Sequence, residues 1–195
     1  MLANQLDFIF FFYGLAFILL GATCWTIARS QGRRSAWAAL GGFGFVHGIG
    51  EWLDLTALIV GDAPAFAATR TGLMAVSFVL LLEFAPLKAS QLGARLPGRW
   101  IYVPLLMLVA LIGVFHGTAA AGIAARYAIG FTGAAAASIV LAWLARTLPN
   151  GARRFALSAP AGFALYAVCA GVIVPPAPFW PASVVNHETF AAVAQ

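Results

Sequence analysis

The chain has 195 residues, of which 63% are hydrophobic and only 9% are charged. A soluble domain carries roughly 25% charged residues, so a soluble enzyme or binding domain is excluded. The formal net charge of +5 does not indicate a nucleic-acid partner, because the basic residues stand in short groups between apolar runs rather than along one face. The sequence predicts one integral membrane domain over residues 1–195, with the lipid bilayer as its surroundings.

Six apolar runs follow one another along the chain, and each is long enough to cross a bilayer at about 20 residues per helix, although the fourth is short. They cover residues 8–28, 36–60, 69–87, 100–116, 126–145 and 155–174. The runs predict an all-α fold, a polytopic membrane bundle of about six transmembrane helices. Prolines from Pro175 onward stop the sixth helix, so residues 175–195 are expected to form a tail outside the membrane or along its outer interface.

Basic residues alternate between the connections of this predicted bundle. Residues 29–35, 88–99 and 146–154 hold nine of the eleven Lys and Arg residues, whereas residues 61–68 and 117–125 hold none. Because basic loops stay on the cytoplasmic side of a membrane, the alternation predicts an N-terminus outside the cytoplasm.

Ionisable residues inside the spans are expensive in hydrocarbon and usually face a bundle interior or water. The second run carries His47, Glu51 and Asp54 at positions i, i+4 and i+7, which places them on one stripe of a helix. The predicted topology brings further polar residues to the same outer side: Arg70, His116, Arg126, His187 and Glu188. This asymmetry is the strongest functional signal in the sequence.

Three explanations compete for the outer cluster. Ion pairs of Glu51 and Asp54 with Arg70 and Arg126 would hold the helices in register. A metal site would use His47 and Glu51 together with His116 or His187. A water-accessible ligand pocket would use Arg70 or Arg126 for an anion and apolar walls such as Trp52. The candidate ligand-binding residues are therefore His47, Glu51, Trp52, Asp54, Arg70 and Arg126.

No sequence motif predicts catalysis. The chain lacks a His-Glu-x-x-His pair, a phosphate-binding glycine loop and a Gly-x-Ser-x-Gly turn, so we expect no enzyme activity and name no catalytic residue. The sequence does not identify a cofactor, and a metal ion is one candidate for the outer cluster. Haem is less favoured, because His47 and His116 are expected at different depths and neither belongs to a histidine pair on one helix.

Three segments resemble the N-terminal multi-spanning membrane region of bacterial sensor histidine kinases and diguanylate cyclases. The two stronger ones are Phe11-Phe-Tyr-Gly-Leu-Ala-Phe17 and Phe43-Gly-Phe-Val-His-Gly-Ile-Gly-Glu-Trp-Leu-Asp54. The weaker one is Asn186-His-Glu-Thr-Phe190. The resemblance implies a sensory or ligand-binding input module in a bacterial inner membrane, with His47, Glu51 and Asp54 in the sensed site.

The resemblance also sets expectations for partners. In such families a seventh helix and a cytoplasmic output follow the tail, and this sequence stops at Gln195. We therefore expect either a fragment or a member that works with a cytoplasmic signalling partner or as a homo-oligomer. The alternative function is a small integral subunit of an electron-transfer or transport complex, which binds haem or quinone or serves as an anchor.

Overall fold

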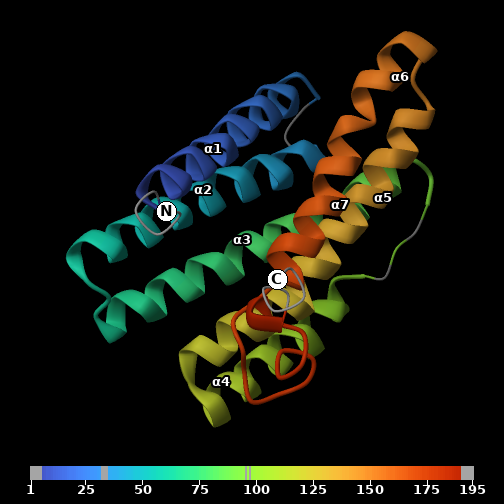
Figure 1. Ribbon diagram of the computed structural model, residues 1–195. Helices are drawn as coiled ribbons and strands as arrows, with labels where there is room; N and C mark the ends of the chain where they lie inside the picture. Colours follow the sequence, from blue (N-terminus) through green and yellow to red (C-terminus); the bar gives the residue numbers. More distant parts are fainter. Residues whose placement is uncertain (1–5, 32–34, 95, 97, 190–195) are drawn as a thin grey trace. The chain divides into compact units, whose positions relative to one another are not determined.

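The computed structural model describes residues 6–31, 35–94, 96 and 98–189, and every regular element in that part of the chain is a helix (Figure 1). The predicted all-α fold is thus confirmed. In chain order the elements are α1 (Leu6–Gln31), α2 (Ala36–Val60), α3 (Pro64–Gln91), the 3-10 helix η2 (Arg99–Ile101), α4 (Tyr102–Ala125), the π-helix η3 (Arg126–Phe131), α5 (Thr132–Arg146), α6 (Asn150–Ala156) and α7 (Ser158–Gly171).

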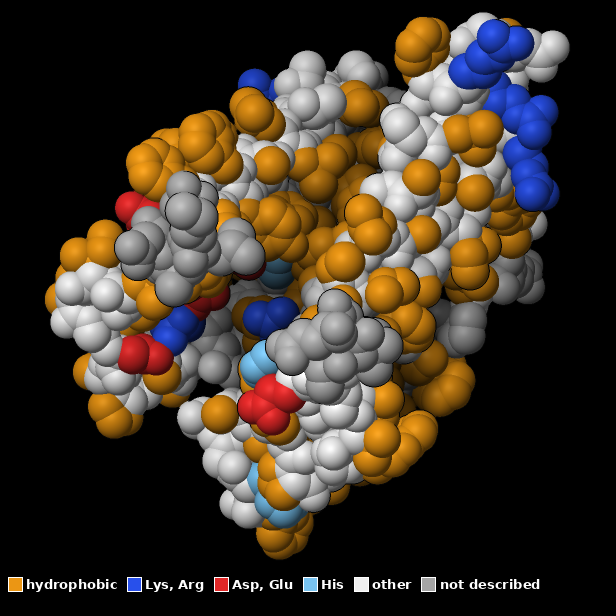
Figure 2. Space-filling view, in the orientation of Figure 1, with side chains coloured by type: hydrophobic (Ala, Val, Ile, Leu, Met, Phe, Trp, Pro, Cys, Tyr) orange, Lys and Arg blue, Asp and Glu red, His pale blue; other side chains and the backbone are white. Residues whose placement is uncertain are grey.

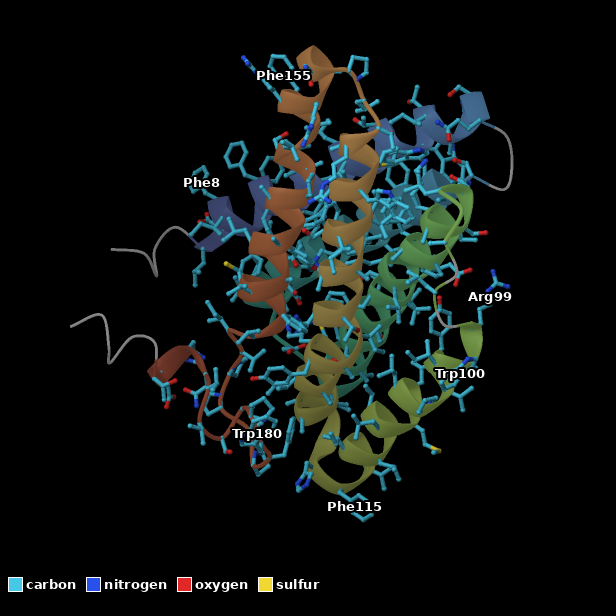
Figure 3. The ribbon with its side chains drawn as sticks, turned by 90° about the vertical axis from the view of Figure 1, so that its right-hand side faces the viewer. Phe8, Arg99, Trp100, Phe115, Phe155 and Trp180 are labelled. Carbon is cyan, nitrogen blue, oxygen red and sulfur yellow. The ribbon has the colours of Figure 1, made fainter. Side chains whose placement is uncertain are left out.

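Within the described part of the chain, five helical stretches are long and apolar enough to cross a membrane: Leu6–Gln31, Ala36–Val60, Pro64–Gln91, Arg99–Arg146 and Asn150–Gly171. Large aromatic side chains on these stretches point outward, as Figure 3 shows for Trp100, Phe115 and Phe155. Their exposed fractions are 68%, 75% and 83%, which suits a surface in contact with lipid rather than water. The chain is a polytopic helical membrane bundle. Its orientation stays a prediction.

Gly117 divides the fourth stretch into two arms. A straight helix of 48 residues would be about 72 Å long at 1.5 Å per residue, more than twice the thickness of a bilayer core. Gly117 instead has φ +86°, a left-handed value that glycine adopts without strain. The chain doubles back there, since a Cβ on Gly113 would lie 3.0 Å from that of Ala121.

This reversal bears on two predictions. The predicted spans 100–116 and 126–145 fall on separate arms of the stretch, and the count of about six spans stays a prediction. The predicted connection 117–125 is wrong beyond its first residue, because α4 continues to Ala125 and leads directly into η3. The run of alanines there has a high helix propensity, which favours a helix over a loop.

The chain forms two compact units, Met1–Leu80 and Leu81–Gln195, and α3 contributes to both. The prediction of one membrane domain stays a prediction. In the first unit α1 packs on α2 through glycines: a Cβ on Gly44 would lie 2.6 Å from the backbone nitrogen of Gly21, and one on Gly48 would lie 2.7 Å from the carbonyl oxygen of Gly14. Small residues allow this close backbone approach between membrane helices.

In the second unit the tail folds back onto the helices. α7 ends at Gly171, before the prolines, as predicted. The described part of the tail then packs Val174 and Ala182 against Ile123 of α4. The hydroxyl of Tyr127 in η3 donates to the carbonyl of Val185 at 3.1 Å. Residues 190–195 of the predicted tail, and the loop residues Arg33, Arg34 and Arg95, lie outside the described residues.

Candidate functional site

His47 is buried in the first unit, on α2. Its side chain is 7% exposed, and three aromatic rings surround the imidazole. Phe17 of α1 meets the imidazole edge-on with 4.5 Å between ring centroids, Phe43 stacks on it at 5.1 Å, and Phe78 of α3 lies at 5.6 Å. Burying a polar group without a hydrogen bond costs roughly 2 kcal/mol or more, so this imidazole needs polar neighbours.

Both ring nitrogens of His47 have such a neighbour. Nδ1 lies 3.0 Å from Oγ of Ser77 on α3, and the Ser77 hydroxyl donates its hydrogen to the carbonyl of Met74 at 2.7 Å. Since a hydroxyl has only one hydrogen, Ser77 accepts from His47, and we assign the imidazole proton to Nδ1. Nε2 of His47 then turns its lone pair toward Oε1 of Glu51, 3.5 Å away.

That arrangement leaves a place for one more proton. A neutral Nε2 and an ionised carboxylate oxygen are both acceptors, so they face each other favourably only when a proton or a small cation lies between them. The Glu51 side chain is 12% exposed, which limits the water that could separate the two groups. The His47–Glu51 pair is thus chemically a binding place for a proton or a compact cation, within a helix that is apolar enough to span a membrane.

A second polar cluster lies near the loop that connects α2 to α3. Arg70 bonds Asp54 on α2 through Nη1 and Asp62 in the connecting loop through Nη2. The guanidinium carbon also lies 5.6 Å from the ring centroid of Phe66, a distance typical of cation–π contact. Of the ion pairs considered from the sequence, the structure contains that of Asp54 with Arg70, while Glu51 faces His47. The Arg70 guanidinium thus lies between two carboxylates.

The two clusters repeat at the same spacing on antiparallel helices. His47 and Asp54 are seven residues apart on α2, and their partners Ser77 and Arg70 are seven residues apart on α3. Seven residues are about two helical turns, or roughly 10 Å. A charged pair near the α2–α3 loop and a neutral polar pair deeper in the unit therefore fix one register between the helices.

Trp52 has a packing contact rather than an open face. Its indole Nε1 donates to the carbonyl of Phe11 on α1 at 3.2 Å, and the two rings stack with 6.2 Å between centroids. A Cβ on Gly14 would meet the same indole at 2.6 Å. The structure therefore places Trp52, which we predicted as a wall of a ligand pocket, between α1 and α2.

The predicted residues of the second unit make contacts of their own. Arg126 of η3 donates to the carbonyl of Ala170 at 3.4 Å. His187 is exposed, with Nδ1 3.3 Å from the carbonyl of Val174, and the exposed His116 lies beside Phe179 at 6.5 Å between ring centroids.

These contacts bear on the predicted metal site of His47, Glu51, His116 and His187. In residues 6–31, 35–94, 96 and 98–189, no group of three or more His, Cys, Asp or Glu side chains is placed to hold a metal ion. His47 and Glu51 lie together in the first unit, whereas His116 and His187 belong to the second. Sequence spacing along one helix could predict the pair but not ligands from other helices.

Glu83 in the second unit is also paired. Arg99 donates to Oε1 of Glu83 through Nε at 2.9 Å, and the Tyr102 hydroxyl donates to Oε2. Both partners lie at the start of the helical stretch that follows α3, so the Glu83 carboxylate ties that stretch to α3.

Sequence reasoning missed Ser77, Asp62 and Phe66. Phe66 lies four residues before Arg70 and Ser77 seven after it on α3, so helical periodicity held a usable signal for these two, whereas Asp62 lies in the loop before the helix. The serine was overlooked because a lone hydroxyl in an apolar run normally bonds its own helix, as Ser77 also does through Met74.

Comparison with known proteins adds no relative: no family model, no curated protein and no solved structure matches the chain.

Proposed function

We propose that the chain is a sensory or ligand-binding input module of bacterial signal transduction, embedded in the inner membrane, with the polar site of α2 and α3 as the part that responds. The observation that carries the proposal is the facing pair of His47 Nε2 and Glu51 Oε1 at 3.5 Å in a buried, aromatic environment. Ionisable groups are rare and expensive in membrane helices, so they usually serve a function.

The ligand class follows from the atoms of the site. An imidazole lone pair and a carboxylate oxygen attract a proton or a compact cation and repel an anion. The ion pairs of Arg70 with Asp54 and Asp62 lie nearer the α2–α3 loop. A stimulus entering from the predicted outer side would meet these ion pairs before it reached His47.

The response would be a change in packing between α2 and α3. A bound proton alters the charge of the His47–Glu51 pair. It thereby alters the strength of the hydrogen bond between Nδ1 of His47 on α2 and Ser77 on α3. A ligand shifts a conformational equilibrium only by its difference in affinity for the two states, and this contact is made by both helices. We propose that the module passes the shift to a cytoplasmic partner or a second copy, and that it has no catalytic activity of its own.

Spin-label distances test the proposal. Labels at Ile49 on α2 and Val76 on α3, which are 46% and 53% exposed, would be introduced into a variant that lacks Cys24 and Cys169. With the proton as the probe, lowering the pH from 8 to 5 should change the distance distribution. Glu51→Gln should abolish the change, because an amide cannot share the proton.

The matched control is Glu188→Gln, which makes the same chemical change at an exposed tail residue and should leave the response intact. An unchanged distribution in the parent chain, or a response that survives Glu51→Gln, would favour an ion-pair scaffold or a membrane anchor over an input module.

A further inference from the structure

Three arginines of the second unit lie exposed at the junction of α5 and α6. Arg146 ends α5, and Arg153 and Arg154 lie on α6. Arg70 and Arg99 bond carboxylates, whereas no ion pair joins any of these three to an acidic side chain of the described residues. Figure 2 shows basic side chains gathered over this end of α6, with no acidic side chain beside them on the visible face.

An apolar groove runs along α5 from the first of these arginines. Ile139, Ala142, Trp143 and Arg146 line a volume of about 480 Å³. Ile139 is 70% exposed and Trp143 is 39% exposed, so the wall of the groove faces outward. Ile139 precedes Arg146 by about two helical turns, or roughly 10 Å along the axis. The groove thus has a cationic end, where a lipid headgroup could lie, and an apolar length that matches the first part of an acyl chain.

We propose that the groove and the three arginines bind an anionic phospholipid. Its phosphate would lie among Arg146, Arg153 and Arg154, because guanidinium groups form paired hydrogen bonds with phosphate oxygens. One acyl chain would run along Ile139 and Ala142. The indole of Trp143 lies between the two regions, the position that tryptophan favours at a membrane interface.

The chemistry of the surface favours a lipid over other polyanions. A nucleic acid or an acidic peptide would use the three charges and would have no use for the exposed isoleucine wall. A phospholipid uses both. Basic residues beside a membrane attract anionic lipids by about 1 kcal/mol each, so three of them on one junction select a charged headgroup over a zwitterionic one. The inference is independent of the function proposed for the first unit.

Fluorescence quenching provides the test. The full chain would be reconstituted in phosphatidylcholine vesicles that contain a graded fraction of phosphatidylglycerol brominated in its chains. A parallel series would contain brominated phosphatidylcholine. The signal of Trp143 is the difference between the parent and Trp143→Phe. We expect the groove to bind phosphatidylglycerol about fivefold more tightly than phosphatidylcholine. A fivefold ratio of affinities corresponds to about 1 kcal/mol, the contribution of one arginine contact.

Charge variants decide the outcome. The triple variant Arg146→Gln, Arg153→Gln, Arg154→Gln should bring the ratio of phosphatidylglycerol to phosphatidylcholine affinity close to one. If the triple variant does not insert, Arg146→Gln alone should still lower this ratio. Arg29→Gln removes an exposed arginine at the end of α1 and should leave the preference unchanged. Equal quenching by both lipids, a preference that survives the arginine variants, or displacement of the lipid by inorganic phosphate would overturn the proposal.

Discussion

Nδ1 of His47 lies 3.0 Å from Oγ of Ser77, so one hydrogen bond joins α2 to α3 inside the apolar part of the first unit. Ser77 is fully buried, and the His47 side chain is 7% exposed, which leaves neither group an alternative partner in bulk water. This contact fixes the tautomer of the imidazole, and the tautomer in turn directs the lone pair of Nε2 at Glu51.

Removing the Ser77 hydroxyl should destabilise the first unit. Ser77→Ala leaves Nδ1 of His47 without its acceptor on α3, and interhelical hydrogen bonds in membranes are worth about 1 kcal/mol. The measurement is the free energy of unfolding in mixed micelles. Ser158→Ala is the control, since that exposed hydroxyl bonds only a carbonyl of the preceding turn. Equal effects of the two variants would contradict the importance of the interhelical bond.

A methyl group on Gly44 should disrupt the packing of α1 on α2. The added Cβ would lie 2.6 Å from the backbone nitrogen of Gly21 and 2.7 Å from the carbonyl oxygen of Phe17, and neither backbone atom can move without the helix. We expect Gly44→Ala to cost at least about 2 kcal/mol of stability.

Gly50 on the same helix provides the comparison, because nothing lies within 4 Å of a Cβ there. Gly50→Ala should be neutral or slightly stabilising, as alanine is the better helix former. Thermal unfolding of the two variants in parallel separates steric overlap from helix propensity. Similar melting temperatures would show that the two helices do not approach closely at Gly44.

Replacing Arg70 should loosen the α2–α3 loop. Arg70→Gln leaves Asp54 and Asp62 close together without the cation between them, and we expect a loss of about 1–2 kcal/mol, below the value for a fully buried pair because the groups are partly exposed. Arg70→Lys should recover only part of it, since an ammonium group does not reproduce the fork that reaches both carboxylates.

A double-mutant cycle checks the Arg70 account. If Asp54 and Arg70 interact directly, Asp54→Asn together with Arg70→Gln should cost less than the sum of the single changes. Additive losses would place the stabilising effect of Arg70 elsewhere.

The site geometry also makes a spectroscopic prediction about haem. Nδ1 of His47 engages Ser77 and Nε2 faces Glu51, so neither nitrogen is directed at a position where haem iron could bind axially. Any visible absorption of the purified protein should therefore be insensitive to His47→Asn. A haem band that disappears in this variant would exclude the arrangement described here.

Parts of the site could be predicted from the sequence because helical periodicity is strong in apolar runs. His47, Glu51 and Asp54 fall on one stripe at 3.6 residues per turn, and the short α2–α3 loop makes the helices antiparallel, which brings Arg70 opposite Asp54. The pairing of His47 with Ser77 could not be predicted in this way, because many small polar residues in membrane helices bond only their own backbone.

The chain reverses at Gly117, where the predicted fourth span over residues 100–116 gives way to a connection. A single positive φ of +86° at this glycine turns the chain while helical hydrogen bonding continues on both sides. The sequence could not show that one residue makes the turn in place of a connection over residues 117–125. Hydropathy averages over many residues, so it indicates where an apolar run ends and not which residue turns the chain.

The central claim is that a proton binds between Nε2 of His47 and Glu51, and nitrogen NMR of ring-labelled histidine tests it most directly. The signals of His116 and His187 would be identified with glutamine variants at these positions. We predict that Nδ1 of His47 carries a proton throughout, and that the protonation of Nε2 on lowering the pH differs between the parent and Glu51→Gln. A ring protonated on Nε2 instead of Nδ1, or one whose state does not respond to pH or to Glu51, would contradict the account.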